Sequence, residues 1–255
     1  MDFKNKVVLV TGSSKGIGAA LARAFAREGA LVIVNYLRDE QAAHSVVQDC
    51  LDAGGDAWAL RADVTQRGEV DALIAQALAE TGHIDVVVNN AFRPYHFDPD
   101  QRCRFDAIDW ASYQQQFEGA VQGAYNVCQA VVPSMRLRAR GSVINMASDL
   151  AEHPVVPYHD YATAKSALVG FSRNLAAELG PSGIRVNCVA PGLVWPTQAS
   201  CGTRETIREQ LAEQTPLRRI ASPDDVAGPV LFLASDWSRF MTGQVLYVDG
   251  GLLMR

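Results

Sequence analysis

The feature that most constrains the fold is a regular alternation between short apolar runs and longer helical stretches. The apolar runs are VVLV at 7–10, LVIVNY at 31–36, AWALRADV at 57–64, IDVVVNN at 84–90, SVINMAS at 142–148, IRVNCVAP at 184–191 and QVLYVDGG at 244–251. Uninterrupted apolar strands that are joined by helices indicate a parallel sheet covered on both faces. We therefore expect an α/β, doubly wound fold with a seven-stranded parallel sheet and helices on both faces.

The intervening stretches have helical patterns and contain neither internal repeats nor linkers. The clearest helices are expected from Lys15 to Ala30, after the run at 31–36 through about Asp52, from Glu69 to Ala79, between Trp110 and Arg138, and from Tyr161 to about Leu179. Length also favours one large unit over two small ones. We expect a single domain over residues 1–255.

Composition excludes several classes of function. The net charge of −5 gives no electrostatic reason to expect nucleic acid or an anionic membrane as a partner. No apolar stretch approaches the ~20 residues that span a bilayer. The five cysteines have no metal-ligand spacing and read as reduced thiols, so we expect no metal site and a cytoplasmic location.

A glycine-rich loop, TGSSKGIG at 11–18, joins the first strand to the first helix. Glycines let backbone N–H groups approach a pyrophosphate, and the helix N-terminus adds a partial positive charge. A tight strand-to-helix turn would explain the glycines without a ligand. The strand before the loop and the helix after it favour dinucleotide binding.

A second feature is the segment YATAK, in which Tyr161 precedes Lys165 by four residues. That spacing places both side chains on one helical face. The pair is either an ordinary surface contact or a phenol whose proton is made labile by a cation. The segment alone leaves both readings open.

Together these motifs resemble the short-chain dehydrogenase/reductase family, in particular its 3-oxoacyl-acyl-carrier-protein reductase-like branch. TGSSKGIG is similar to the family's TGxxxGxG loop, and Ser148 lies thirteen residues before Tyr161, the family spacing. The remaining matches, in order along the chain, are Asp63-Val64, Asn89-Asn90-Ala91, Pro191-Gly192 and the closing TGQVLYVDGG. The resemblance covers nearly the whole chain and implies a Rossmann-type fold.

The resemblance implies hydride transfer to or from a carbonyl. Tyr161 would act as acid and base, Ser148 would hydrogen-bond the substrate oxygen, and Lys165 would hold the nicotinamide ribose. A free tyrosine has a pKa of ~10, too high for easy proton transfer at neutral pH, and we expect Lys165 together with the positive nicotinamide of the oxidised cofactor to lower the pKa of Tyr161. Without the resemblance, Ser148 could be a strand-end cap, Tyr161 a half-buried helix residue and Lys165 a solvated charge.

The cofactor expected is NADP(H), with NAD(H) as the alternative. A ribose 2′-hydroxyl is usually held by a carboxylate at the end of the second strand, but here no acid occurs until Asp39. Lys15 and Arg38 could instead reach a 2′-phosphate; both could equally be solvent-exposed cations. The full set expected to bind the cofactor is Gly12, Ser14, Lys15, Gly16, Ile17, Gly18, Arg38, Asp63, Val64, Asn90, Ala91, Tyr161, Lys165, Pro191, Gly192 and Val194.

Two positions depart from the family pattern. Phe92 replaces a glycine that follows Asn-Asn-Ala, so its ring must turn away or reshape the site. The family's active-site asparagine aligns with Ala120, or with Phe117 when counted from Trp110. In the family that asparagine helps to hold a water that links the lysine to solvent. We expect reduced turnover, a relay rebuilt from another group, or a narrower chemistry.

Two long segments, 92–109 and 192–205, are expected at the carboxyl ends of the strands, as functional loops or as variable surface. In and near them, Trp195 is a candidate lid, and His153 and His159 are candidates for substrate contact. The function expected is interconversion of a ketone and a secondary alcohol, with a 3-oxoacyl thioester as one candidate substrate. The alternative is a catalytically weak NADP(H)-binding sensor or partner module. By resemblance, the last helix and strand would form a homotetramer or homodimer.

Overall fold

The computed structural model describes residues 1–254, in which seven strands form one sheet. Their bounds are β1 Val7–Val10, β2 Leu31–Tyr36, β3 Asp56–Arg61, β4 Val86–Asn89, β5 Gly141–Met146, β6 Ile184–Pro191 and β7 Val245–Val248. The order across the sheet is β3-β2-β1-β4-β5-β6-β7, and every neighbouring pair is parallel. The expected seven-stranded, doubly wound sheet is confirmed.

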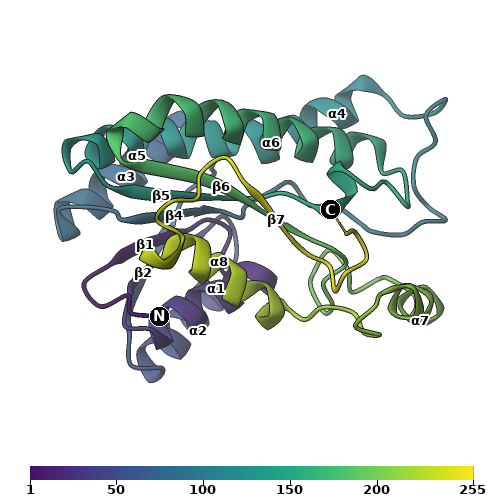
Figure 1. Ribbon diagram of the computed structural model, residues 1–255, viewed down its shortest axis with the longest axis horizontal. Coiled ribbons are helices and arrows are strands. Elements are labelled where there is room, and N and C mark those ends of the chain that lie inside the picture. The colour runs from purple at the N-terminus through teal and green to yellow at the C-terminus, as the bar shows by residue number, and fades with distance from the viewer. Residues whose placement is uncertain (255) are drawn as a thin grey trace.

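Helices cover both faces of this sheet. Their bounds are α1 Gly16–Arg27, α2 Glu40–Asp52, α3 Arg67–Thr81, α4 Trp110–Phe117, α5 Gly123–Leu137, α6 His159–Leu179, α7 Glu205–Gln214 and α8 Pro223–Ala234. One layer contains α1, α2 and α8, and the other contains α3 to α6, whereas α7 lies apart at one end of the molecule (Figure 1). None of the helices in residues 1–254 is long and apolar enough to cross a membrane.

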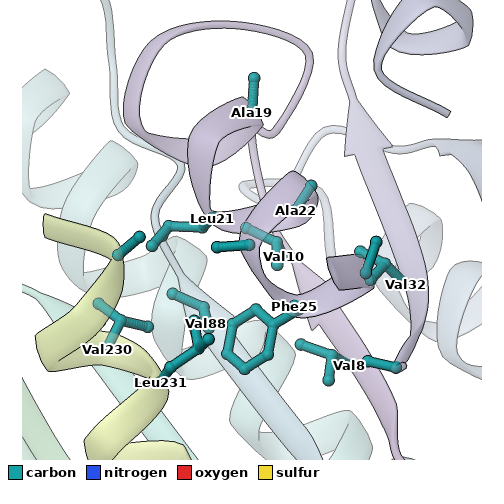
Figure 2. Close-up of a cluster of buried hydrophobic side chains, with 14 of the residues drawn as sticks. Val8, Val10, Ala19, Leu21, Ala22, Phe25, Val32, Val88, Val230 and Leu231 are labelled. Atoms are coloured by element: carbon teal, nitrogen blue, oxygen red, sulfur yellow. The ribbon is translucent and has the colours of Figure 1, made fainter. Parts of the chain in front are cut away.

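The two helical layers pack on alternate residues of the same strands. Val8 and Val10 of β1 join the cluster beneath α1 and α8, whereas Val7 and Leu9 join the cluster on the opposite face. Figure 2 shows Phe25 of α1 packed among the strand valines and beside α8. Full burial of such a side chain contributes roughly 1.5–3 kcal/mol, so this cluster fixes α1 firmly against the sheet.

Two elements differ in detail from the sequence-based expectation. The helix expected from Trp110 to Arg138 contains one π-helical turn, Glu118–Gln122, between α4 and α5. The last strand ends at Val248 instead of continuing through the glycines, because Gly250 and Gly251 adopt left-handed φ values of 68° and 88°. The π-helical turn packs against α6, the helix that carries Tyr161.

The strand order places the candidate site. The order reverses between β1 and β4, and in sheets of this type ligands bind beyond the carboxyl ends of the strands at that point. The loops after β1, β4, β5 and β6 all leave the sheet at this edge because the strands are parallel. The glycine loop, Asn90, Ser148 and Gly192 are therefore brought to one side of the molecule.

Candidate active site

The glycine loop forms an open cradle at the start of α1. Gly12 and Gly16 adopt φ values of 60° and 56°, which a side chain would strain. A Cβ on Gly12 would lie 3.0 Å from the Ala91 Cα, whereas one on Gly16 would have its nearest described neighbour, Thr197, at 3.6 Å. No described side chain caps the first turn of α1, which begins after Lys15. The first N–H groups of the helix are thus available to an anion, and the cradle fits a dinucleotide phosphate.

Hydrogen bonds fix this loop to the sheet. The Gly12 N–H donates to Asn35 Oδ1 at 3.1 Å, and Asn90 Nδ2 donates to the carbonyl oxygens of Thr11 and Gly12 at 2.9 and 3.1 Å. Gly18 is buried where a Cβ would lie 2.5 Å from the Gly12 carbonyl oxygen, so α1 packs directly on the loop. The cradle is therefore held by contacts among the strands themselves.

The cations expected at the end of β2 differ in environment. Lys15 Nζ lies 2.5 Å from Asp39 Oδ2, and this contact is the main reason that the pKa of Asp39 is lowered. Asp39 also accepts a hydrogen bond from the Ala42 N–H at the start of α2. Arg38 is exposed. Lys15 and Arg38 both lie at this end of the sheet, but Lys15 is already paired with the Asp39 carboxylate.

The remaining residues expected to bind the cofactor line the same edge. Asp63 accepts from the Thr65 N–H and hydroxyl, and the Val64 carbonyl accepts from Asn126 Nδ2 at 2.9 Å. The others lie as follows: Ser14 is half-buried in the loop, Ile17 packs on the core from α1, Pro191 ends β6, Gly192 follows it, and Val194 is buried just beyond. The structure thus brings the expected set to one edge of the sheet.

Ser148, Tyr161 and Lys165 converge on one point below that edge. Ser148 follows β5, and its hydroxyl lies close enough to the Tyr161 phenol to lower the pKa of the phenol. Lys165 lies one turn along α6 with its Nζ 5.6 Å from the Tyr161 ring centroid, and it donates to the Met146 carbonyl oxygen at 2.6 Å. All three are buried, and Lys165 is only 4% exposed. The surface-contact reading of this pair is therefore wrong.

Burial controls the acidity of this group. Burial raises the pKa of Tyr161 well above the ordinary value, the neighbouring Ser148 hydroxyl lowers it in part, and the charge of Asp149 raises it further. Burial also lowers the pKa of Lys165 to about 8, because a buried ammonium loses its hydration. Desolvation is thus the largest effect on the phenol in this structure, and the lowering of its pKa by Lys165 together with an oxidised nicotinamide stays a prediction.

Aromatic side chains from segment 92–109 cover the phenol. The Tyr95 and Phe97 rings each have their centroid 5.1 Å from that of Tyr161, and Tyr158 packs against both. The Tyr95 hydroxyl donates to Asp160 Oδ1 at 2.8 Å, the same oxygen that accepts from the Tyr161 N–H. This cover was not predicted residue by residue, although the aromatic content of the segment was a signal for it.

Phe92 also faces the site. Its ring centroid is 5.4 Å from Lys165 Nζ and 6.3 Å from the Tyr161 ring centroid. The ring has therefore not turned away from the site, and it lies beside the two residues expected to meet a nicotinamide ribose. The substitution of a glycine at this position reshapes the space above Lys165.

The position expected for the family's asparagine lies in the π-helical turn. Ala120 is buried there, and a Cβ on Gly123, three residues on, would lie 2.8 Å from Val64 Cγ2. Asn126, which is near in sequence, donates its amide to the Val64 carbonyl. Asn126 thus holds the loop after β3 in place and is not turned toward Lys165.

The two long segments are fastened to each other. The Phe97 N–H donates to the Ala199 carbonyl at 3.3 Å, the Thr203 hydroxyl donates to the Phe97 carbonyl at 3.2 Å, and Arg204 pairs with Asp100. The cover over Tyr161 is therefore tied to the segment after β6.

Trp195 and the two histidines lie elsewhere. The Trp195 ring lies beneath the Arg208 guanidinium of α7, whose carbon is 4.1 Å from the ring centroid. His159 meets Phe105, and His153 is exposed. The rings over Tyr161 thus come from segment 92–109 and Tyr158, and not from Trp195.

Comparison with known proteins agrees with this geometry. Residues 12–253 match the sequence model of the family described as Enoyl-(Acyl carrier protein) reductase. A 3-oxoacyl-[acyl-carrier-protein] reductase, FabG, of Chlamydia muridarum is 38% identical over 251 residues, which are 97% of this chain and 97% of that protein.

Solved structures are similar over the same length. A gluconate 5-dehydrogenase from Burkholderia cenocepacia J2315, in complex with NADP and tartrate, has a TM-score of 0.89 at 32% identity, covering 98% of this chain and 96% of that one. The promiscuous reductase LugOII, which catalyses keto-reduction at C1 during lugdunomycin biosynthesis, has a TM-score of 0.88 at 33% identity, with both chains fully covered. Fold, motif order and sequence agree over almost the entire chain. The chain belongs to the short-chain dehydrogenase/reductase family, whose members are oxidoreductases.

Proposed function

We propose that the protein interconverts a ketone and a secondary alcohol with NADP(H), using Tyr161 as the acid and base. The observation that carries the proposal is the convergence of Ser148, Tyr161 and Lys165 at the edge of the sheet that also holds the glycine cradle. When bound, the dinucleotide supplies or accepts the hydride.

Each of the three residues has a distinct task in this proposal. Tyr161 gives its phenolic proton to the carbonyl oxygen in reduction and takes a proton from the alcohol in oxidation. Because burial raises its pKa, Tyr161 is a neutral phenol near pH 7 and is ready to donate. Ser148 holds the substrate oxygen beside the phenol, and Lys165 contributes the positive charge that stabilises the phenolate.

The preference for NADP(H) over NAD(H) belongs to the same proposal. It is supported by Lys15 and Arg38 at the end of β2, where a 2′-phosphate would lie. Asp39 opposes it in part because its carboxylate already pairs with Lys15. The NADP-bound Burkholderia gluconate 5-dehydrogenase agrees with this choice.

The substrate is proposed only as a class. A small-molecule carbonyl or secondary alcohol fits the FabG and LugOII relatives, and FabG suggests 3-oxoacyl thioesters in particular. The aromatic cover of Tyr95, Phe97 and Tyr158 favours a substrate with an apolar or planar group next to the carbonyl.

We further propose a single-domain cytoplasmic protein that assembles as a homotetramer or homodimer. Strand β7 supports the assembly, because it is an edge strand whose four residues are only half-buried. Light scattering at several protein concentrations tests it.

A second candidate function is an NADP(H)-binding sensor with weak catalysis. It is favoured by Ala120 at the family's asparagine position and by the Phe92 ring above Lys165. The retained convergence of Ser148 and Lys165 on Tyr161 counts against it.

Isotope transfer distinguishes the two. Incubation with NADPH deuterated at C4 of the nicotinamide and a panel of ketones should yield alcohols that carry one deuterium at the carbinol carbon, as measured by mass spectrometry. Binding of NADPH with no deuterated product from any ketone would favour the sensor.

A further inference from the structure

Asp149 is a buried acid at the centre of the candidate site. It follows Ser148 directly and begins the short 3₁₀ turn Asp149–Ala151. Its side chain is 5% exposed, and Oδ1 accepts the Ser148 hydroxyl hydrogen at an oxygen-to-oxygen distance of 3.2 Å. Its main-chain carbonyl accepts the N–H groups of Glu152 and His153, both at 2.9 Å, so its position is fixed.

The surroundings of Asp149 hold no partner cation. Among residues 1–254, no lysine or arginine forms an ion pair with it, and its carboxyl is met by hydrogen bonds from the Ser148 hydroxyl and the Leu150 N–H. The group that faces it from the turn after β7 is another acid, Asp249, and α6 contributes the Tyr161 phenol. Gly192 lies between the two acids, because a Cβ there would be 3.3 Å from Asp149 Oδ2 and 3.1 Å from Asp249 Cβ.

Burial is the largest cause that raises the pKa of Asp149, to about 6, and the Asp249 charge adds to it. Asp249 itself is engaged by the Gly251 and Leu253 N–H groups, each at 2.9 Å. Burying a carboxyl without a partner cation costs folding free energy. The presence of Asp149 beside the proposed reacting group therefore needs a functional explanation.

The hydrogen bonds of Ser148 explain what Asp149 can do there. The hydroxyl has one hydrogen to donate and two lone pairs, one of which accepts the Leu150 N–H at 3.3 Å. When Asp149 is ionised, the hydrogen goes to the carboxylate, and the second lone pair can accept from the Tyr161 phenol. When Asp149 is protonated, its own O–H can occupy that lone pair, and the serine hydrogen is free to point at Tyr161 or at a substrate oxygen.

We propose that Asp149 is a positioning residue that sets the direction of the Ser148 hydrogen bond. The inference rests on the proposed function, because it concerns how Ser148 meets the substrate carbonyl. Protonated Asp149 makes Ser148 a donor, which stabilises a carbonyl oxygen during reduction. Ionised Asp149 makes Ser148 an acceptor and weakens that step.

The Asp149→Asn variant tests the proposal because an amide N–H can donate permanently to Ser148. With saturating NADPH, we expect wild-type kcat for ketone reduction to fall about three- to tenfold as pH rises through about 6. In Asp149→Asn this fall in kcat should be absent. Asp160→Asn is the matched control, because Asp160 is also buried but accepts from the Tyr95 hydroxyl and the Tyr161 main-chain N–H and not from Ser148, and asparagine can still accept both, so the fall in kcat should remain.

Infrared spectroscopy gives a readout that needs neither cofactor nor turnover. The difference spectrum between the wild type and Asp149→Asn should contain a carboxyl C=O band that titrates near pH 6. In Ser148→Ala this band should titrate at higher pH, because the serine hydrogen bond stabilises the carboxylate. The shift of the band between wild type and Ser148→Ala is read from pH difference spectra of each protein alone, so it stands even where Asp149→Asn is poorly folded or where no ketone is turned over.

Two results would overturn the inference. One is the same pH dependence of kcat in wild type and Asp149→Asn. The other is a band whose midpoint does not move in Ser148→Ala. A lack of turnover with every ketone would count against the proposed function, and the infrared titration would still decide the role of Asp149.

Discussion

The phenyl ring of Phe92 lies over the ammonium of Lys165, with the ring centroid 5.4 Å from Nζ. The contact brings a cation and an aromatic face within the range of a cation–π interaction. It also places a bulky ring where the proposed mechanism requires Lys165 to meet the nicotinamide ribose. We therefore expect cofactor binding to displace the ring.

Phe92→Gly should bind NADPH more tightly. Removing the ring abolishes the displacement, and we expect the Kd to fall about three- to tenfold, which corresponds to about 0.7–1.4 kcal/mol. Protein-to-NADPH fluorescence energy transfer measures it. Phe105→Ala removes an exposed ring of the same segment and should leave the Kd unchanged. An unchanged or higher Kd in Phe92→Gly would show that the ring does not compete with the cofactor.

Asp39→Asn should strengthen the preference for NADPH. The substitution removes the charge that pairs with Lys15, and asparagine can still accept the Ala42 N–H that begins α2. We expect the Kd for NADPH to fall about two- to fivefold and that for NADH to stay constant, as measured by calorimetry. Glu40→Gln, an exposed neighbour on α2, is the control. An equal change in the Kd for NADPH and for NADH would show that Lys15 does not recognise the 2′-phosphate.

Lys165→Met should make the protein more stable and inactive. Burial lowers the pKa of Lys165 from 10.5 to about 8, so the unfolded chain binds the proton more strongly than the folded one. The resulting destabilisation of the folded protein is complete below about pH 8, the pKa in the folded state, and disappears as the pH rises through 10.5, the pKa in the unfolded chain. At about 1.4 kcal/mol per pKa unit, the shift corresponds to about 3 kcal/mol, and we expect a gain of about 1–3 kcal/mol at pH 7.

Urea unfolding at about pH 7 and again near pH 10 measures this gain, which should shrink at the higher pH. Lys4→Met, at an exposed site, should change little at either pH. A loss of stability in Lys165→Met at pH 7 would mean that the bond to the Met146 carbonyl outweighs the desolvation of the ammonium.

Phe97→Ala should uncover the Tyr161 phenol. The Phe97 ring packs edge-on against Tyr161, and its loss should raise the rate of Tyr161 nitration by tetranitromethane several-fold. Mass spectrometry of peptides identifies the modified tyrosine. The exposed Tyr125 provides an internal reference whose rate should not change. An equal rate of Tyr161 nitration in the wild type and in Phe97→Ala would show that Phe97 does not cover the phenol.

The sequence predicts the sheet well because each strand is a continuous apolar run between helices, as in Val7–Val10 and Ile184–Pro191. It also predicts the glycine cradle, and its resemblance to the short-chain dehydrogenase/reductase family implies the convergence of Ser148, Tyr161 and Lys165. The aromatic cover could not be predicted, because it depends on how segment 92–109 folds back onto α6 through contacts such as that of Tyr95 with Asp160.

The pKa values of the site residues could not be predicted from the sequence either. The spacing of Tyr161 and Lys165 suggests that the cation, together with an oxidised nicotinamide, lowers the pKa of the phenol, whereas burial raises it. Asp149 stands next to Ser148 in the sequence, yet its importance comes from the distant Gly192 and Asp249 that enclose it. Such effects arise only when segments far apart along the chain meet.

The most direct test of the central claim is the oxidation of NADPH, beside NADH, by wild type and Tyr161→Phe with a panel of ketones and 3-oxoacyl thioesters. The account predicts turnover that is faster with NADPH and about 10²–10⁴-fold lower in Tyr161→Phe, with NADPH affinity changed by less than about threefold. Wild-type turnover that survives in Tyr161→Phe would contradict the role of the phenol. Tight NADPH binding without turnover on any compound would contradict the enzyme itself and favour the sensor.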